Sequence, residues 1–251
     1  MKVTTLPRPL YPVELVVKGR SHHYRVDGKD VLYPGVTGVL QVLNKPALVP
    51  WAAKQAALKI KTYLMAHAVN RLLTAEEIDD LVEAGRTAHE EIKDAAADVG
   101  TRAHQAINAM IDGGEMTITD DIKPCVDAFL DFIARDSLKI EHGDTKIASK
   151  LYGYGGSLDA LGNENGRLVI VDFKTSNGIW PEYALQVAAY SQAFKETYGL
   201  GYLPEALILR IGKVTPDFEV KRVRCIADCF DQFKAALTLY HGSKAKVYEV
   251  A

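Results

Sequence analysis

The sequence is poor in cysteine and has neither a long hydrophobic run nor an excess of charge of one sign. Its 251 residues include only three cysteines, Cys125, Cys225 and Cys229, too few and too oddly numbered for a disulfide framework. Three cysteines also cannot supply the four thiolates of an iron–sulfur cluster within one chain. We therefore expect free thiols in a reducing cytoplasm. The Cys225–Cys229 pair would hold a metal only with ligands from elsewhere in the chain.

The lack of apolar runs argues against a membrane-spanning or secreted protein, and the lack of net positive charge argues against a protein that binds nucleic acid through bulk charge. No stretch approaches the roughly 18 apolar residues that cross a bilayer, and residues 1–12 lack the apolar core of a secretion signal. These absences predict a cytoplasmic protein with no membrane partner. The charges nearly balance, with 30 Lys and Arg against 32 Asp and Glu and a formal net charge of −2. Any contact with nucleic-acid phosphate must therefore be local, because binding through bulk charge requires a basic protein.

The composition, 48% hydrophobic and 25% charged, is that of a globular protein. The length suits one large domain or two small ones. Residues 13–33 have the pattern of β structure, with an Asp27-Gly28 pair typical of a hairpin turn. A helix-rich stretch follows, in which Thr37 caps the first helix and the Thr74–Glu77 spacing of a capping box opens a later one. The helices expected in this stretch are 37–43, 51–72, 74–84, 86–113 and 122–137.

The periodicity changes after residue 138, where short apolar segments alternate with turns that contain Gly and Asn. The expected strands are 139–141, 146–150, 156–161, 168–174, 205–211 and 218–223, and the expected helices are 181–198 and 226–241. Helices followed by strands and further helices predict an α/β or α+β protein with a single sheet flanked by helices.

The most informative residues lie on two of these strands, 156–161 and 168–174, which a short turn joins and which should pair antiparallel. Asp172 and Lys174 stand two residues apart near the end of the second strand, so their side chains share a face. Asp159 lies on the first strand and can approach the same face. Charges that end an apolar run cost desolvation free energy unless they are paired or hold a cation.

The residues alone leave two interpretations of this group open. In the first, two carboxylates, a backbone carbonyl and water supply the hard oxygen ligands that Mg²⁺ or Mn²⁺ prefers. A lysine beside such a metal can orient or deprotonate an attacking water. In the second, Asp172 and Lys174 form an ion pair that ends the strand, and Asp159 is an unrelated turn residue.

The spacing of these residues matches a known motif. Gly156-x-x-Asp159, then about a dozen residues, then Asp172-x-Lys174 at a strand end, resembles the pattern of the PD-(D/E)XK nuclease superfamily. Upstream, Gly100–His104 is similar to the Gly-x-x-x-His motif of the RecB-like exonuclease branch, and downstream Gln186–Tyr190 is similar to the Gln-x-x-x-Tyr motif of the same branch. The four motifs occur in order, and the resemblance covers roughly residues 95–225.

A weaker resemblance extends towards the N-terminus. Residues 33–52 are similar to a segment of mitochondrial genome maintenance exonucleases and their phage relatives, although a serine usually stands where this chain has Gly35. Because the chain lacks the four cysteines of the iron–sulfur members, it resembles the exonucleases that have no cluster.

The resemblance implies a fold and a domain arrangement. The fold is an α/β restriction-endonuclease-like core, in which a central mixed β-sheet is flanked by helices, with a helical N-terminal elaboration. Residues 91–251 would form this core as one continuous domain. Residues 1–90, a hairpin followed by helices, would cover the active site.

The resemblance also implies an activity, that of an Mg²⁺-dependent DNA exonuclease in which Mn²⁺ can substitute for Mg²⁺. The implied metal ligands are His104, Asp159, Asp172 and the carbonyl of Phe173. The implied catalytic residues are Lys174, which would position the attacking water, together with Asp159, Asp172, Gln186 and Tyr190. Without the resemblance, His104 would be interpreted as an ordinary core or surface histidine, and Tyr190 as a hydroxyl at the rim of a helix packed on the sheet.

The expected partners are DNA with a free end and a single-strand annealing protein, in phage-type recombination, replication or repair. A site-specific endonuclease of the same fold and a non-cleaving DNA-binding module remain as alternatives. Basic and aromatic side chains are candidates for a local DNA track, or else for the solvated face of an amphipathic helix. They are Trp51, Lys54, Lys59, Lys61, Tyr63, Arg86 and Arg102.

Overall fold

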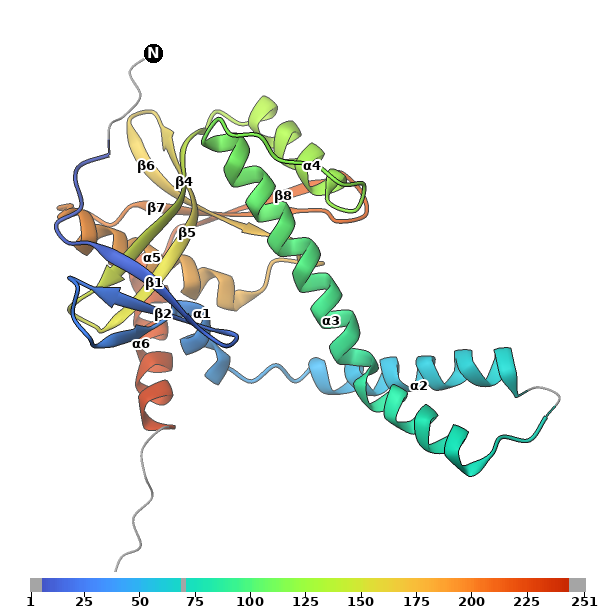
Figure 1. The fold of residues 1–251 in the computed structure, drawn as a ribbon. Helices are drawn as coiled ribbons and strands as arrows, with labels where there is room; N and C mark the ends of the chain where they lie inside the picture. The colour runs from blue at the N-terminus through green and yellow to red at the C-terminus, as the bar shows by residue number, and fades with distance from the viewer. Residues whose placement is uncertain (1–5, 69–70, 244–251) are drawn as a thin grey trace, which may run out of the picture. The chain divides into compact units, whose positions relative to one another are not determined.

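The computed structural model describes residues 6–68 and 71–243. They form a five-stranded sheet covered by helices, a small three-stranded sheet, and two long helices, α2 (Leu48–His67) and α3 (Ala75–Ile111) (Figure 1). The chain divides into two compact units, one made of residues 1–43 and 102–251 and the other of residues 44–101. No helix in the described ranges is long and apolar enough to cross a membrane.

The central sheet has the spatial order β4-β5-β6-β7-β8, with β6 and β7 parallel and the other neighbours antiparallel. Its strands are β4 Lys139–Ser149, β5 Tyr154–Glu164, β6 Arg167–Lys174, β7 Glu205–Ile211 and β8 Phe218–Val223. Parallel neighbours need a crossover connection, and α5, Pro181–Tyr198, supplies it between β6 and β7. The expected central mixed sheet flanked by helices is confirmed.

Helices cover both faces of this sheet. On one face α5 and α6, Ile226–Gly242, enclose an apolar core in which Tyr154, Phe194 and Phe233 are fully buried. On the other face α4, Lys123–Arg135, places the Phe129 ring 5.6 Å from that of Phe173. The end of α3 lies on this second face as well, with Ile107 fully buried. Strands β6 and β7 are buried on both sides, which explains their nearly continuous apolar sequences.

The N-terminal sheet belongs to the same compact unit as the central sheet. Its strands are β1 Val13–Lys18, β2 Ser21–Val26 and β3 Leu32–Pro34, followed by α1 Val36–Val39 and the short 3₁₀ helix Leu40–Val42. Asp27 and Gly28 both have positive φ, 60° and 68°, as expected for a turn after β2. The Tyr11 hydroxyl fixes the segment to β4 by donating to the Ala148 carbonyl at 2.9 Å.

Helices α2, Leu48–His67, and α3, Ala75–Ile111, correct the expected helix boundaries. The capping box is confirmed, since the Glu77 N–H donates to Thr74 Oγ1 at 3.2 Å and the Thr74 N–H to Glu77 Oε2 at 2.9 Å. The expected break between helices 74–84 and 86–113 is wrong, because α3 continues through Gly85. A Cβ at Gly85 would lie 3.0 Å from Ile60 Cδ1, so this glycine permits close packing on α2 rather than ending the helix.

Three other expected boundaries differ. Thr37 does not cap α1, which begins at Val36 after Gly35. Residues 139–141 and 146–150 are not separate strands, since β4 runs through the expected turn with an irregularity at Ile140–His142. The helix expected over 51–72 ends at His67, and residues 69–70 lie outside the described ranges.

The expected domain boundary between residues 90 and 91 falls inside α3, whose residues 75–101 belong to the second unit and 102–111 to the first. That the first 90 residues cover the active site stays a prediction.

Candidate active site

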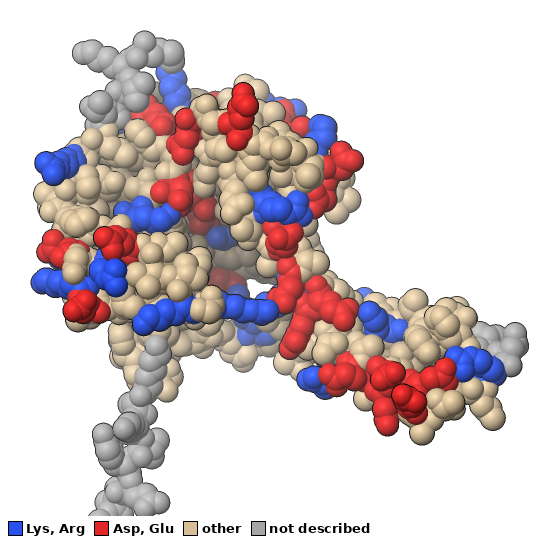
Figure 2. Space-filling view, viewed as in Figure 1, with Lys and Arg blue, Asp and Glu red and all other residues tan. Residues whose placement is uncertain are grey.

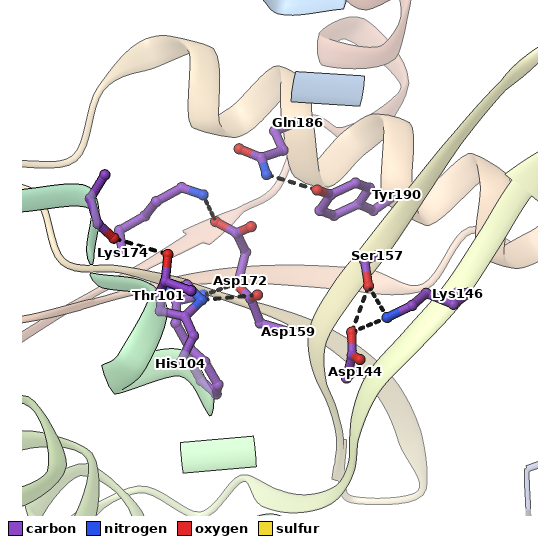
Figure 3. Close-up of polar contacts among 12 residues, drawn as sticks. Thr101, His104, Asp144, Lys146, Ser157, Asp159, Asp172, Lys174, Gln186 and Tyr190 are labelled. Carbon is purple, nitrogen blue, oxygen red and sulfur yellow. Dashed lines mark hydrogen bonds and ion pairs between the residues drawn. The ribbon is translucent and has the colours of Figure 1, made fainter. Parts of the chain in front are cut away.

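The expected site residues lie where β5 and β6 separate (Figure 3). The last pair of the ladder is Ala160–Val171, and Asp159 and Asp172 are the next residues on each strand. The Phe173 N–H, which would continue the ladder, donates instead to Asp159 Oδ2 at 2.7 Å. Because the N–H and C=O of one strand residue point to the same edge, the Phe173 carbonyl faces the same gap. A carboxylate thus takes the place of a backbone acceptor where the sheet opens.

His104 reaches this gap from the last turns of α3. Its Nδ1 lies 3.2 Å from Asp159 Oδ1, across 55 residues of sequence. Its ring packs edge-on against Phe173, with ring centres 5.9 Å apart. The structure therefore brings His104 into contact with Asp159, as a site histidine requires.

Lys174 lies on the buried carboxylate of Asp172. Its Nζ is 2.6 Å from Asp172 Oδ2, and Asp172 is only 1% exposed. This distance is that of a close ion pair, and no other donor among the described residues reaches the buried Oδ2. This contact is the one that the ion-pair interpretation of the sequence anticipated, with the difference that Asp159 belongs to the same group.

Tyr183 is a neighbour of Lys174 that the sequence interpretation missed. The Lys174 ammonium lies 4.7 Å from the centre of the Tyr183 ring, in the geometry of a cation–π contact. The Tyr183 hydroxyl donates to Ser176 Oγ at 3.1 Å, which ties the ring to the loop that follows β6. A signal was present, since Tyr183 precedes Gln186 by three residues and so shares its helix face.

Burial and mutual repulsion set the proton affinities of the site. Burial raises the pKa of Asp172 to about 6 against the opposing effect of Lys174, and the Asp159 charge adds to the rise. Burial also acts upward on Asp159, but His104, Lys174 and the Phe173 N–H together hold its pKa below the ordinary value. Burial alone would lower the pKa values of His104 and Lys174, but the two carboxylates raise both. The two carboxylates therefore resist ionising together unless a cation is added.

The raised pKa of Asp172 predicts a pH-dependent loss of stability when divalent cations are absent. The native state holds this proton up to pH about 6, whereas the ordinary pKa is 3.8. The contribution of Asp172 to the free energy of unfolding therefore falls as pH rises from about 4 to about 6, by a few kcal/mol at most. With both proteins in EDTA, we expect the melting temperature of Asp172→Asn minus that of wild type to increase between pH 4 and pH 7. Asp80→Asn, at an exposed carboxylate, is the control; a difference that does not change with pH would contradict the assigned pKa.

The donor set fits a hard divalent cation in its chemistry. Among the described residues, Asp172 Oδ2 has no donor other than the Lys174 ammonium. The Asp159 carboxylate lies on the neighbouring strand and the Phe173 carbonyl faces the gap, and carboxylate and carbonyl oxygens are ligands that Mg²⁺ uses. No three His, Cys, Asp or Glu side chains within the described part of the chain already form a metal-binding group. The Lys174 ammonium contacts Asp172 Oδ2, so a cation would have to displace the ammonium from this oxygen.

Gln186 and Tyr190 lie beside the carboxylates on α5 (Figure 3). The Gln186 Nε2 donates to the Tyr190 hydroxyl at 2.8 Å, and both side chains are buried. The packing of Tyr190 explains why the motif has a glycine at position 156, since a Cβ there would lie 2.5 Å from Tyr190 Cε1. Burial, followed by the Asp172 charge, raises the pKa of Tyr190 well above its ordinary value. The Tyr190 hydroxyl is therefore not at the rim of the helix but packed behind the site.

A second Asp-x-Lys pair lies beside the first in Figure 3. Ser157 Oγ donates to Asp144 Oδ1 at 2.6 Å and accepts from Lys146 Nζ at 2.8 Å, and Lys146 also contacts Asp144. The Asp144 side chain is 55% exposed. Water can solvate this carboxylate, so it has no unmet need for a cation. Glu141, the other acidic residue of β4, is half-buried and leaves one carboxyl oxygen without a described hydrogen-bond donor.

The expected basic track is largely neutralised. Lys59 pairs with Glu91 at 3.1 Å, and Trp51 packs edge-on against His89 within the same unit. Arg86 and Arg102 also form ion pairs, with Glu83 and Asp121 respectively. Figure 2 shows Asp and Glu side chains gathered on the visible face of the second unit. These contacts favour the alternative of an amphipathic helix with a solvated, charge-paired face.

Comparisons with known proteins add little to this geometry. No protein-family model matches the sequence, and no match is found among curated proteins. The alkaline exonuclease LHK-Exo from Laribacter hongkongensis aligns with 59% of this chain and 86% of its own, at 13% identity and a TM-score of 0.31. The crystal structure of SSO0001 aligns with 77% of this chain and 86% of its own, at 12% identity and a TM-score of 0.32. Similarity at this level supports no conclusion about function.

Proposed function

We propose that this chain is a metal-dependent deoxyribonuclease, and specifically an Mg²⁺-dependent exonuclease that hydrolyses phosphodiester bonds from DNA ends. The observation that carries the proposal is the gathering of Asp159, Asp172 and Lys174 where β5 and β6 separate, with a buried Asp172 oxygen that no described donor but Lys174 reaches. The ordered motifs of the sequence support the same function. The proposed substrate with a free end, and a single-strand annealing protein as partner in recombination, replication or repair, rest on that resemblance.

The carboxylates would hold the cation. Asp172, Asp159 and the Phe173 carbonyl provide oxygen ligands, and a neutral His104 provides nitrogen. When bound, Mg²⁺ or Mn²⁺ supplies positive charge that stabilises the phosphorane-like transition state and the departing oxygen. The Phe173 N–H fixes the orientation of Asp159, and the buried Tyr190 and Gln186 side chains exclude water from behind the site.

Lys174 would act on the attacking water. Its pKa is raised because two carboxylates outweigh burial. A cation bound to Asp172 would neutralise that carboxylate, which raises the pKa of Lys174 more than Asp159 does. Burial, which lowers the pKa of an ammonium, would remain. Lys174 would then be able to accept a proton from the water as it attacks the phosphorus in line. The Tyr183 ring would hold the side chain in place once it has left Asp172.

His104 gives a prediction that separates a site residue from a structural one. His104→Ala should lose most of its Mg²⁺- or Mn²⁺-dependent activity, because it removes both a ligand and the group that orients Asp159 at 3.2 Å. His104→Asp should keep part of the activity, since a carboxylate is also a hard ligand. His142→Ala and His89→Ala are the controls and should lose little. Full activity of His104→Ala in an end-labelled DNA assay would remove the histidine from the site.

Digestion of four DNA substrates tests the function itself. Linear and circular DNA, each single- and double-stranded and the linear forms end-labelled, are incubated with the full chain in Mg²⁺ and in EDTA. We expect shortening of linear DNA in Mg²⁺ alone and no attack on closed circles. Cleavage of the circles would make the protein an endonuclease. No cleavage of any substrate, with retained binding, would make it a DNA-binding module.

A further inference from the structure

Two of the three cysteines meet at the start of α6, in a site that the proposed nuclease chemistry does not use. The Cys225 and Cys229 sulfur atoms are 3.7 Å apart. Cys225 is the N-cap residue of α6, and the Cys229 N–H donates to its carbonyl at 3.0 Å. Because residues four apart lie on one face of a helix, the first turn of α6 holds the two thiols side by side.

The two thiols have different surroundings. Cys225 is exposed, whereas Cys229 is only 7% exposed. Burial, and then the neighbouring Cys225 sulfur, raises the pKa of Cys229 to about 11, so this thiol keeps its proton. Both cysteines line a pocket of about 480 Å³ that Trp180, Lys221 and Arg224 also border. An exposed thiol thus lies at a pocket with a second thiol behind it.

We propose that Cys225 and Cys229 are a dithiol that oxidises reversibly to an intrachain disulfide, with a small external disulfide as the oxidant. The Cys225 sulfur, after losing its proton, attacks one sulfur of the external disulfide. This step breaks that S–S bond, forms a mixed disulfide on Cys225 and releases one thiolate. The Cys229 sulfur then gives up its proton and attacks Cys225 Sγ, which releases the second thiolate. One external disulfide is reduced to two thiols, and the chain loses two hydrogens.

The backbone of α6 permits this bond. Four residues of helix rise about 6 Å, and disulfides span Cα separations of about 4.4–6.8 Å. Cys225 has φ −102° and ψ 55°, outside the helical region, so its side chain can turn towards Cys229 without breaking a helical hydrogen bond. The positive side chains of Lys221 and Arg224 at the same pocket favour the approach of an anionic disulfide such as oxidised glutathione.

The third cysteine serves as an internal control. Cys125 lies on α4, is fully buried, and has a pKa that burial raises. Reactive cysteines are exposed and near positive charge, whereas buried ones are inert. Cys225 should therefore react at least about tenfold faster than Cys125 with any water-soluble disulfide.

The test treats the folded full chain with oxidised glutathione and follows intact mass and the linkage of peptides. We expect wild type and Cys125→Ser to lose two hydrogens, to form a Cys225–Cys229 linkage, and to recover fully with dithiothreitol. Cys229→Ala should stop at one glutathione adduct, on Cys225. Cys225→Ser should remain unmodified.

Three results would overturn the proposal. Wild type would stop at a stable adduct on Cys225 if the buried thiol cannot reach it. It would remain unmodified, together with Cys229→Ala, if Cys225 is not reactive. It would form linkages through Cys125 or between chains if the pair is not the preferred site. Each result is read on protein whose circular dichroism matches that of untreated wild type, so a variant that fails to fold is recognised before the reaction. DNA cleavage is not a readout, so the outcome is independent of the nuclease proposal.

Discussion

Asp172→Asn should abolish metal-dependent DNA cleavage and leave the protein folded. The substitution keeps the shape of a side chain that is 1% exposed but removes its charge, so the proposed cation would lose one of its ligands. We expect activity to fall about a thousandfold or more, because the chemistry depends on the charge that the cation supplies. Asp159→Asn should behave alike and is preferable to Asp159→Ala, since the amide oxygen can still accept the Phe173 N–H.

Thermal unfolding distinguishes loss of the cation from loss of the fold. Mg²⁺ at about one hundred times its Kd should stabilise the wild type by about 2.7 kcal/mol, which for a chain of this size raises the melting temperature by roughly 5–10 °C. The same Mg²⁺ should leave the melting temperatures of Asp172→Asn and Asp159→Asn unchanged. Asp80→Asn should respond like wild type. Equal Mg²⁺-induced shifts in all four proteins would remove the proposed metal site.

Lys174→Ala should still bind metal and DNA but should lose most of its turnover. In the proposed complex the ammonium would be one charge among several that contact the DNA backbone, so we expect its loss to change binding little. Loss of a group that positions or deprotonates the attacking water should lower kcat by about 10²–10⁴-fold. Because Lys174 lies 2.6 Å from Asp172 Oδ2, its removal also frees that oxygen, and Mg²⁺ should bind at least as tightly as in wild type.

Lys146→Ala is the matched control for this prediction. Lys146 follows Asp144 at the same spacing at which Lys174 follows Asp172, on the neighbouring part of the sheet. It should keep nearly all of the turnover. Titration of Mg²⁺ by calorimetry, DNA binding in Ca²⁺, and single-turnover cleavage in Mg²⁺ separate the three steps. A Lys174→Ala enzyme that cleaves at close to the wild-type rate would show that the lysine only pairs with Asp172.

The two Asp-x-Lys pairs show how far the sequence alone determines the site. The spacing of Asp144 and Lys146 is identical to that of Asp172 and Lys174, so spacing does not distinguish them. The apolar run Leu168–Val171 does, because it predicts burial, and the structure leaves Asp172 buried and Asp144 half in solvent. The contact of His104 with Asp159 lies beyond any local pattern, since 55 residues separate them. Only the resemblance to a known order of motifs predicted it.

The same division applies to the fold. Helix α5, Pro181–Tyr198, and strand β7, Glu205–Ile211, begin and end as expected because local signals fix them, such as Pro181 in the first turn and Gly199 with φ 69° after the last. Gly85 has the same local signal for a helix end, yet α3 continues through it. Its reason is the Ile60 side chain, which is distant in sequence and packs where a Cβ would stand. The sequence likewise offered Cys225 and Cys229 only as part of a metal site with ligands from elsewhere, whereas the structure places their sulfur atoms 3.7 Å apart at the start of α6.

The hydrogen bond from the Phe173 N–H to Asp159 gives the protein a spectroscopic reporter of its own. The paired residues of β5 and β6 end at Ala160–Val171, and the Phe173 N–H just beyond them donates to a charged side chain rather than to a backbone carbonyl. Charge-assisted hydrogen bonds are shorter and stronger than neutral ones, so the proton should resonate at low field in an NMR spectrum. Protonating Asp159, or drawing its charge towards a cation, would weaken that bond and move a single resonance. Site occupancy is thereby readable from one backbone amide, without DNA and without a label in the site.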